Sequence, residues 1–450
     1  MVTTMTEGKP LRLIMQFTLP LLIGNVFQQL YNITDVIIVG RTLGVEALAA
    51  VGATIPIFMI AVGATIGLTS GMSVIAGQEF GAKNLAGVKE SAAVALTISV
   101  IYMFLFMIIT HIFLAPLLRM IDVPEEIFKQ SYDYISILLY GIGTTTLYNL
   151  AAALMRALGD SKTPLYFLVI SSILNIVLAL IFIICFGWGV IGSAIALVIA
   201  EGLSGALCLW YIYHKVPALH LQKRDFVLTG SKVWQHLKMG CPMALQFAIL
   251  GIGILVLQAV CNSFGPTYIA GFTAAGRVEQ LALQPMISVG IATAVFTAQN
   301  FGAKRFDRIR QGVKMASFML MGFSVVAAVT SYFFGPEIIK LFIEEGDGAT
   351  IKAGVTYLHT TVPFYIFLSQ IFIFRNATQG LGLSFMPFGS GVVELVARSG
   401  AALILGGRMG YLGMCYASPF SWMGACTFLS LGYFYFIKVL EKQKYNHGQV

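Results

Sequence analysis

The chain has 450 residues, of which 58% are hydrophobic and only 11% are charged, and its mean hydropathy is +0.84. A soluble domain carries about 25% charged residues, so this composition excludes an ordinary soluble enzyme and is typical of a protein with many membrane spans. The net charge of +8 is concentrated in particular loops. That distribution is expected for membrane topology rather than for nucleic-acid binding.

Twelve apolar stretches are long enough to cross a bilayer, which requires about 20 apolar residues in a helix. They form two groups of six, separated by a polar connector at 215–236. The sequence therefore predicts an all-α polytopic membrane protein, with an N-terminal bundle at 1–214, a C-terminal bundle at 237–437 and a tail at 438–450. The expected spans are 13–40, 47–75, 91–115, 131–155, 164–186, 190–214, 237–262, 267–298, 313–335, 351–374, 385–407 and 411–437.

Lys and Arg are unevenly distributed among the loops between these spans. With the N-terminus inside, 20 of the 28 Lys and Arg residues face the cytoplasm and six face outward. The remaining two, Arg277 and Arg398, fall inside spans. Because cytoplasmic loops are enriched in Lys and Arg, we expect a multi-pass protein of the cytoplasmic membrane with both termini in the cytoplasm.

The two groups of spans repeat each other in sequence. Gln78–Lys83 (QEFGAK) recurs in the second group as Gln299–Lys304 (QNFGAK), and Gly189–Ala194 aligns with Gly410–Cys415 at the same offset. Each half contains an even number of spans, so both halves enter the membrane with the same orientation. This predicts a parallel repeat of two pseudo-symmetric six-helix bundles, related by an axis along the membrane normal, with a central cleft for binding.

A polar stripe runs along the first span. Asn25, Gln28, Asn32 and Asp35 recur at spacings of 3, 4 and 3, which places them on one face of a helix. Four polar residues could form a seam between packed helices. An ionisable group inside the membrane is costly, however, and favours a functional role. Since burial disfavours the charged form of a carboxylate and no base lies at helical spacing, Asp35 is expected to exchange a proton near neutral pH.

The other ionisable residues inside the spans have readier structural explanations. Glu394 and Arg398 are four residues apart on one span, which favours a structural ion pair. Arg277 and Glu279 are two apart, so they face different sides of their helix and each needs a partner elsewhere. Glu279 is either structural or a second titrating group. Glu201 is expected to be structural, with a functional role as the alternative.

Motifs for soluble catalysis or nucleotide hydrolysis are missing from the sequence. There is no Walker A motif, and the six His residues lack the spacing of metal ligands. The six Cys residues fall within apolar runs, where they are expected to act as small packing residues. We therefore expect neither an enzyme nor a bound cofactor or resident metal.

Several of these segments together resemble the multidrug and toxic compound extrusion (MATE) family of secondary transporters. The resemblance covers essentially the whole chain and implies two bundles of six helices that work by alternating access. It also implies efflux of amphipathic, often cationic drugs and dyes, driven by inward flow of H+ or Na+. The residues that carry it are Pro20, Gly24–Val36, Gly77–Ala82, Arg156–Asp160 with Thr163–Pro164, Asn175 and Gln299–Ala303.

The resemblance also assigns roles to particular residues. Asp35 matches the first-helix acid that family members use for cation coupling, and Pro20 matches a proline at which that helix bends, as loss of a backbone hydrogen bond would allow. The coupling and substrate cavity of the N-terminal half is expected to include Gln28, Tyr31, Asn32, Asn149 and Asn175. The corresponding candidates in the C-terminal half are Gln246, Arg277, Glu279 and Gln370.

The chain departs from the family pattern at two places. Many relatives carry an Asp four residues after the fifth-span Asn, where this chain has Ala179. Spans seven and ten, which carry acids in the NorM branch, offer Gln246, Gln258 and Gln370. The expectation is a proton-coupled exporter of DinF-like or NorM-like bacterial type, with Na+ near Asp35 as the alternative coupling ion.

Other functions remain as rival hypotheses at this point. The principal hypothesis is a monomeric drug and cation antiporter whose partners are the lipid bilayer and small amphipathic compounds, without nucleic acid. A flippase for a lipid-linked or oligosaccharide substrate is the main alternative, although it would need more basic residues facing its cavity. A receptor or enzyme in the membrane is the third, and the lack of a catalytic constellation argues against it.

Overall fold

The computed structural model describes residues 4–342 and 348–447, except for the side chains of 30–32 and 444–447. Every regular element in this part of the chain is a helix. Eleven helices are long and apolar enough to cross a membrane, and a bent pair, Glu125–Tyr140 with Ile142–Ala157, supplies a twelfth span if its two pieces are counted as one. The prediction of an all-α polytopic membrane protein is confirmed.

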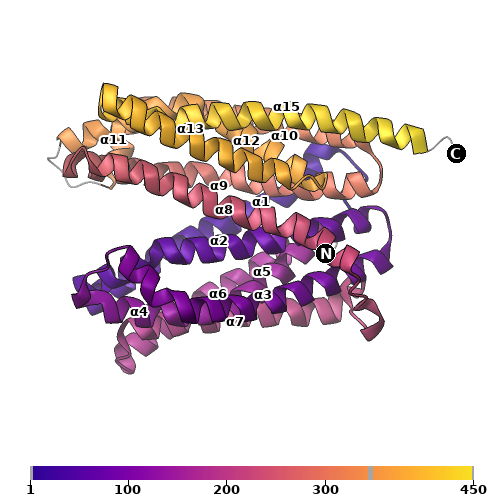
Figure 1. Ribbon diagram of the computed structural model, residues 1–450, viewed down its shortest axis with the longest axis horizontal. Coiled ribbons are helices and arrows are strands. Elements are labelled where there is room, and N and C mark those ends of the chain that lie inside the picture. The colour runs from indigo at the N-terminus through magenta and orange to yellow at the C-terminus, as the bar shows by residue number, and fades with distance from the viewer. Residues whose placement is uncertain (1–3, 343–347, 448–450) are drawn as a thin grey trace. The chain divides into compact units, whose positions relative to one another are not determined.

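The helices of the two halves follow the same order along the chain (Figure 1). The first half contains α1 (Pro10–Leu43), α2 (Val45–Gly81), α3 (Leu85–Met120), α4 (Glu125–Tyr140), α5 (Ile142–Ala157), α6 (Lys162–Leu180) with a π-helical turn at Ile181–Cys185, and α7 (Gly189–Lys215). The second half contains α8 (Gly230–Asn262), α9 (Pro266–Gly302), α10 (Phe306–Lys340), α11 (Gly348–Thr361), α12 (Tyr365–Gly380), α13 (Phe385–Met409), α14 (Tyr411–Cys415) and α15 (Ala417–His447).

The fourth span of each half is interrupted. The helices α4 and α5 meet at Gly141 with a bend of 41°. Their second-half counterparts, α11 and α12, are separated by a 3-10 turn at Val362–Phe364. The two halves therefore share even this irregularity.

The repeat is also visible in the backbone conformation. Lys83 and Lys304 end the equivalent turns after α2 and α9 in the left-handed region, with φ of 59° and 56°. Gly44 and Gly265 precede those two helices with φ of 86° and 96°. A left-handed lysine is uncommon, so its recurrence at the offset of the repeat shows that the two sequence motifs fold alike.

The chain divides into two compact units whose boundaries differ from the expected division at 1–214 and 237–437. Among the described residues, the first unit comprises Thr4 and Leu19–Ala244, and the second comprises Met5–Thr18 and the residues from Leu245 onward. The boundaries thus fall inside α1 and α8. Each of these two helices begins in one unit and continues into the other.

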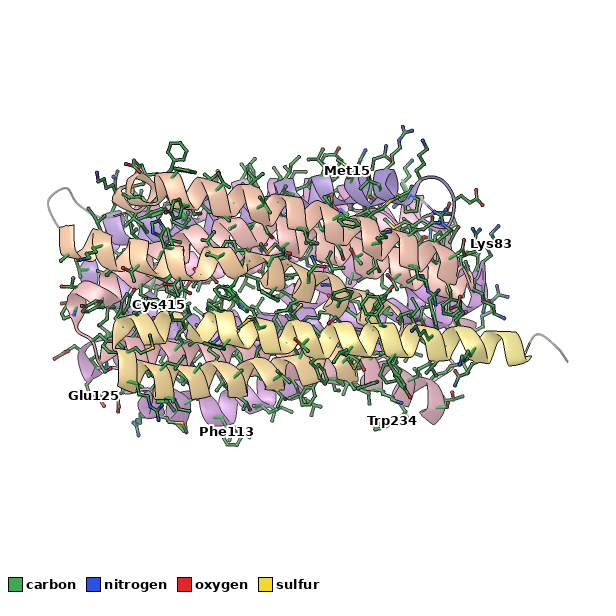
Figure 2. The ribbon with its side chains drawn as sticks, turned by 90° about the horizontal axis from the view of Figure 1, so that it is seen from above. Met15, Lys83, Phe113, Glu125, Trp234 and Cys415 are labelled. Atoms are coloured by element: carbon green, nitrogen blue, oxygen red, sulfur yellow. The ribbon has the colours of Figure 1, made fainter. Side chains whose placement is uncertain are left out.

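Within the first unit, glycines allow close helix packing. A Cβ at Gly67 of α2 would lie 2.5 Å from the carbonyl oxygen of Met243 in α8, so no larger residue fits there. The outer face of α3 is apolar, with Ile101, Phe104 and Ile108 exposed as on a surface that faces lipid. Figure 2 shows Lys83 at one end of this unit and Glu125 at the other.

Within the second unit, the N-terminal segment is anchored to the turn after α9. Met5 is 2% exposed, and its backbone N–H donates to Gln299 Oε1 at 2.8 Å. Its carbonyl oxygen accepts from Asn300 Nδ2 at 3.1 Å and from Arg308 Nη2 at 3.2 Å. Arg308 Nη1 also donates to the carbonyl oxygen of Gly8 at 2.9 Å. These bonds hold the start of α1 on the second unit.

Candidate functional site

The carboxylate of Asp35 lies between α1 and α7 in the first unit. Its Oδ1 accepts a hydrogen bond from Ser193 Oγ at 3.2 Å. Ser193 is fully buried and Asp35 is partly buried. Tyr134 of α4 lies within electrostatic range of the carboxylate. Among the described side chains Asp35 forms no ion pair, so its near neighbours are neutral hydroxyl groups.

The helices α1 and α6 run parallel beside each other. A Cβ at Gly24 of α1 would lie 2.9 Å from Leu165 Cδ1 of α6, and Ile38 packs in one cluster with Ala179. Both pairings join residues that are separated by the same distance along the sequence. The register between the two helices is therefore constant over this length.

This register puts Asn175 of α6 at the level of Thr34 and Asp35. The Asn175 side chain is 1% exposed, and neither its amide nitrogen nor its amide oxygen has a hydrogen-bond partner in the described part of the chain. An unsatisfied buried amide costs about 1–3 kcal/mol. Such a group at the level of a carboxylate is suited to binding a ligand that supplies the missing partner.

Ala179 stands where a second carboxylate would be expected from the family pattern. It is 0% exposed and packs with Ile38, Ile183 and Ala196. This apolar cluster closes the site one helical turn beyond Asn175. The departure at Ala179 is thus accommodated by packing, and the site retains one carboxylate at this level.

The remaining N-half candidates are less closely associated with Asp35. Gln28 is exposed, and Asn149 donates its amide to the carbonyl oxygen of Thr145 in its own helix at 2.8 Å. The side chains of Tyr31 and Asn32 lie outside what the structure describes. The contact that was not foreseen is Ser193, which lies in the repeated Gly189–Ala194 segment.

A second membrane carboxylate of the first unit is Glu201 on α7. It accepts a hydrogen bond from Thr145 Oγ1 of α5. Its Cα lies about 12 Å along the helix from that of Ser193. Like Asp35, Glu201 has a hydroxyl partner and no ion pair among the described side chains.

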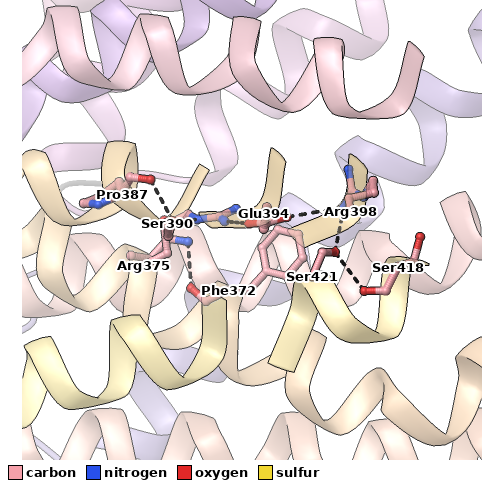
Figure 3. Close-up of polar contacts among 9 residues, drawn as sticks. Phe372, Arg375, Pro387, Ser390, Glu394, Arg398, Ser418 and Ser421 are labelled. Carbon is pink, nitrogen blue, oxygen red and sulfur yellow. Dashed lines mark hydrogen bonds and ion pairs between the residues drawn. The ribbon is translucent and has the colours of Figure 1, made fainter. Parts of the chain in front are cut away.

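The second unit contains a buried ionic triad that bridges α12 and α13 (Figure 3). Figure 3 shows Glu394 between Arg375 and Arg398. Arg375 Nη2 makes an ion pair with Glu394 Oε1, and Arg398 Nη2 lies 3.4 Å from Glu394 Oε2. Arg375 Nε also donates to Ser390 Oγ at 3.2 Å. Arg375 lies outside the spans expected from the sequence, but the structure buries it inside the unit. The expected contact between Glu394 and Arg398 is present alongside it.

The C-half candidates do not gather into one polar cluster. Glu279 accepts from the Tyr357 hydroxyl at 2.9 Å, and Arg398 is the base that acts on it electrostatically. Gln246 is 3% exposed with no partner for its Oε1 among the described residues, and Arg277 is exposed. Gln370 donates to the carbonyl oxygen of Ser317 at 3.4 Å and to Ser369 Oγ at 3.3 Å.

The chain is similar to known transporters over most of its length. The family model described as MatE matches residues 20–181 and 242–398. The chain is 29% identical over 395 residues to the probable multidrug resistance protein YoeA of Bacillus subtilis, covering 86% of this chain and 85% of that protein. It is 22% identical over 386 residues to the probable multidrug resistance protein NorM of Thermotoga maritima, covering 83% of this chain and 81% of that one.

The fold matches solved structures just as broadly. A MOP superfamily transporter from Pyrococcus furiosus, described in terms of a reverse polarity of its binding pocket, superposes with a TM-score of 0.91 at 25% identity. The match covers 97% of this chain and 98% of that structure. The arrangement of helices around Asp35 is therefore built on a frame shared with known transporters.

Proposed function

Because the chain belongs to the MatE family of multidrug and toxic compound extrusion transporters, we propose that it exports amphipathic, often cationic compounds in exchange for protons. The exchange takes place across the cytoplasmic membrane, with both termini in the cytoplasm. The names of relatives such as the probable multidrug resistance protein YoeA support this class of substrate. Asp35 is the residue that couples the two fluxes.

The observation that carries the proposal is the neutral surrounding of Asp35. An ionised carboxylate in a membrane span is costly unless a cation neutralises it. Ser193 offers a hydroxyl, which can donate to a carboxylate or accept from a carboxylic acid. With no ion pair among the described side chains, the neutralising charge is supplied by a bound proton or by a cationic substrate. Each excludes the other, which is the linkage that antiport requires.

The proton is favoured over Na+ as the coupling ion. A hard cation prefers several oxygen ligands, including charged ones. Asn175 and Ser193 offer neutral oxygens, but Ala179 and its apolar neighbours stand where a second carboxylate would be expected. One carboxylate suffices for a proton and makes a weak site for Na+.

The flippase alternative has less support. Binding a lipid-linked phosphate requires basic side chains that are free to hold it. Arg375 and Arg398 are the buried arginines of α12 and α13, and Glu394 contacts both of them. Both are buried in contact with a carboxylate, so neither is free to hold a phosphate.

The test is dye efflux from proteoliposomes that contain the purified full-length chain. Ethidium export is expected under an imposed pH gradient and not under a Na+ gradient alone. Asp35→Asn is expected to abolish export while the protein remains monodisperse in detergent, since the amide has no exchangeable charge. Glu201→Gln is the matched control, because it removes the other hydroxyl-supported acid of the same unit and is expected to leave export intact.

Two results would contradict the assignment. Export that survives in Asp35→Asn would show that coupling lies elsewhere, and loss of export in Glu201→Gln alone would move it to α7. Export driven by the Na+ gradient would retain Asp35 as the site and change the coupling ion.

A further inference from the structure

The helices α6 and α13 occupy equivalent places in the two halves. The turn at Arg156–Gly159 before α6 recurs as Gln379–Gly382 before α13. Both turns end in a left-handed glycine, with φ of 88° at Gly159 and 84° at Gly382. When the two helices are aligned on these glycines, the counterpart of Asn175 is Arg398. The neutral amide that lies level with Asp35 is thus replaced in the second half by a guanidinium.

The helix that packs against this position carries a smaller residue in the second half than in the first. In the second unit, Gly253 of α8 lies beside Arg398, and a Cβ at Gly253 would lie 3.3 Å from Arg398 Nη1. At the offset that aligns Lys83 with Lys304, the first-half counterpart of Gly253 is Asn32. A pair of Asn residues in one half therefore corresponds to a Gly and an Arg in the other, and the glycine makes room for the longer side chain.

The acid of the first half has no counterpart on α8. At the offset that pairs Asn32 with Gly253, the counterpart of Asp35 is Val256. At the offset that pairs Asn175 with Arg398, the counterpart of Ala179 is Ala402, which is also fully buried. At equivalent levels, the first half therefore carries one carboxylate and the second half carries one guanidinium.

The guanidinium of Arg398 is buried but incompletely paired. Arg398 is 7% exposed, and its Nη2 lies 3.4 Å from both Glu394 Oε2 and Ser421 Oγ. Its Nε has no hydrogen-bond partner in the described part of the chain. Glu394 makes its shorter contact with Arg375. Arg398 therefore supplies positive charge beyond what Glu394 alone requires.

A second carboxylate within electrostatic range of Arg398 is Glu279 of α9. Arg398 acts on it electrostatically, and Tyr357 donates a hydrogen bond to it at 2.9 Å. Two arginines, Arg375 and Arg398, thus stand against two carboxylates, Glu279 and Glu394. Among the described residues of this cluster the charges cancel, whereas Asp35 and Glu201 of the first unit face hydroxyl groups.

We propose that Arg398 is a built-in cation that permanently occupies, in the second half, the level at which the first half binds its exchangeable cation. Cation exchange is thereby confined to the half that contains Asp35. This inference rests on the proposed role of Asp35 and extends it to the second half.

Removing the guanidinium should create an exchange site where none exists. In Arg398→Asn, which reproduces the first-half residue, Glu279 and Glu394 would face Arg375 alone and leave one carboxylate uncompensated. Neutral neighbours of this cluster are Gly253 of α8, Tyr357 of α11, Tyr365 of α12, and Ser418 and Ser421 of α15. A buried carboxylate without a base takes up a proton.

The test is infrared spectroscopy of the purified full-length chain at neutral pH, which distinguishes a protonated carboxylic acid from a carboxylate. Arg398→Asn is expected to show one additional protonated carboxyl group per chain. The signal should persist in Arg398→Asn/Asp35→Asn and disappear in Arg398→Asn/Glu279→Gln. Arg398→Lys is the matched control, because it retains the charge and should show no additional signal.

Two results would overturn the inference. One is a monodisperse Arg398→Asn protein without the additional carboxyl signal. The other is a misfolded Arg398→Asn protein that Glu279→Gln fails to restore, since removing both charges returns the cluster to neutrality. Failure of the proposed function is read separately, from dye efflux in Asp35→Asn, and does not alter the infrared result.

Discussion

The two halves of the chain share a backbone design but use charge differently inside the membrane. Their turns recur at fixed offsets, down to the left-handed Lys83 and Lys304. Two acids inside the expected spans of the first half, Asp35 and Glu201, accept from hydroxyl groups. The principal acid of the second half, Glu394, contacts two guanidinium groups. The repeat therefore determines where helices lie, and a few side chains determine which half can exchange a cation.

The difference has an energetic meaning. A carboxylate that accepts from Ser193 or Thr145 can gain or lose a proton, because a hydroxyl group can reverse its hydrogen bond. A carboxylate between two arginines cannot do so cheaply, since arginine does not release its proton in proteins. The carboxylates of the first half are thus suited to exchanging a cation, whereas Glu394 of the second half keeps its charge.

The largest expected effect follows from breaking the permanent charge cluster. Glu394→Gln would leave Arg375 and Arg398 buried together without their shared anion, and protonation cannot relieve them. Removing one partner of a buried ion pair costs about 3–5 kcal/mol. We expect the melting temperature, measured by size-exclusion chromatography after heating, to fall by roughly 3–5 °C.

The matched change in the first half is Glu201→Gln. A glutamine carbonyl can still accept from Thr145, and no base is left without its partner, so the expected loss is about 1 kcal/mol or less. The contrast between the halves would be wrong if the two glutamine variants lost the same stability. It would also be wrong if Glu394→Gln melted like the unchanged protein.

A smaller effect is expected at the turn that the two halves share. Arg308 anchors the N-terminal segment through the carbonyl oxygens of Met5 and Gly8 and also donates to Asn300 Oδ1 at 3.0 Å. Its first-half counterpart is Gly87, which has no side chain for such a role. Arg308→Met should cost about 1.5–3 kcal/mol, the value of a hydrogen bond to a charged group. It should also speed amide hydrogen exchange at Met5, whose N–H is bonded to Gln299.

The neighbouring Arg305 provides the control for this prediction. Its ion pair with Asp307, at 2.9 Å, lies on the surface with both side chains about half exposed. Exposed pairs contribute little, so Arg305→Met should change neither the melting temperature nor the exchange at Met5. Equal effects of the two substitutions would argue against specific anchoring by Arg308.

Much of the fold was predictable from sequence because it follows from hydropathy and repetition. The spans, the constant offset between the two halves and the family are all visible along one chain. The contact between Asp35 and Ser193 was not, since it depends on how α1 and α7 are rotated against each other. A serine among small residues carries no sign of that role.

Arg375 shows a second limit of sequence reasoning. The expected tenth span ended at residue 374, because a charged residue lowers the hydropathy that defines a span. The structure continues α12 to Gly380 and buries Arg375 against Glu394. A charge compensated by a distant residue is therefore mistaken for a loop, and the neutral cluster of the second half could not be foreseen.

The smallest expected effect tests whether the shared frame is equivalent in both halves. Lys83 and Lys304 adopt the same left-handed conformation, and in each turn the N–H of this residue donates to the carbonyl oxygen three positions earlier, at 3.0 Å and 2.9 Å. That conformation costs an L-residue about 1–2 kcal/mol, whereas glycine adopts it freely but loses about 0.5–1 kcal/mol more entropy on folding. Lys83→Gly and Lys304→Gly should therefore each raise the melting temperature by roughly 2 °C or less, and by the same amount. A stabilisation confined to one half would mean that the surroundings of the turn outweigh the backbone conformation that the two turns share. The surroundings differ because the N-terminal segment is anchored at the second turn.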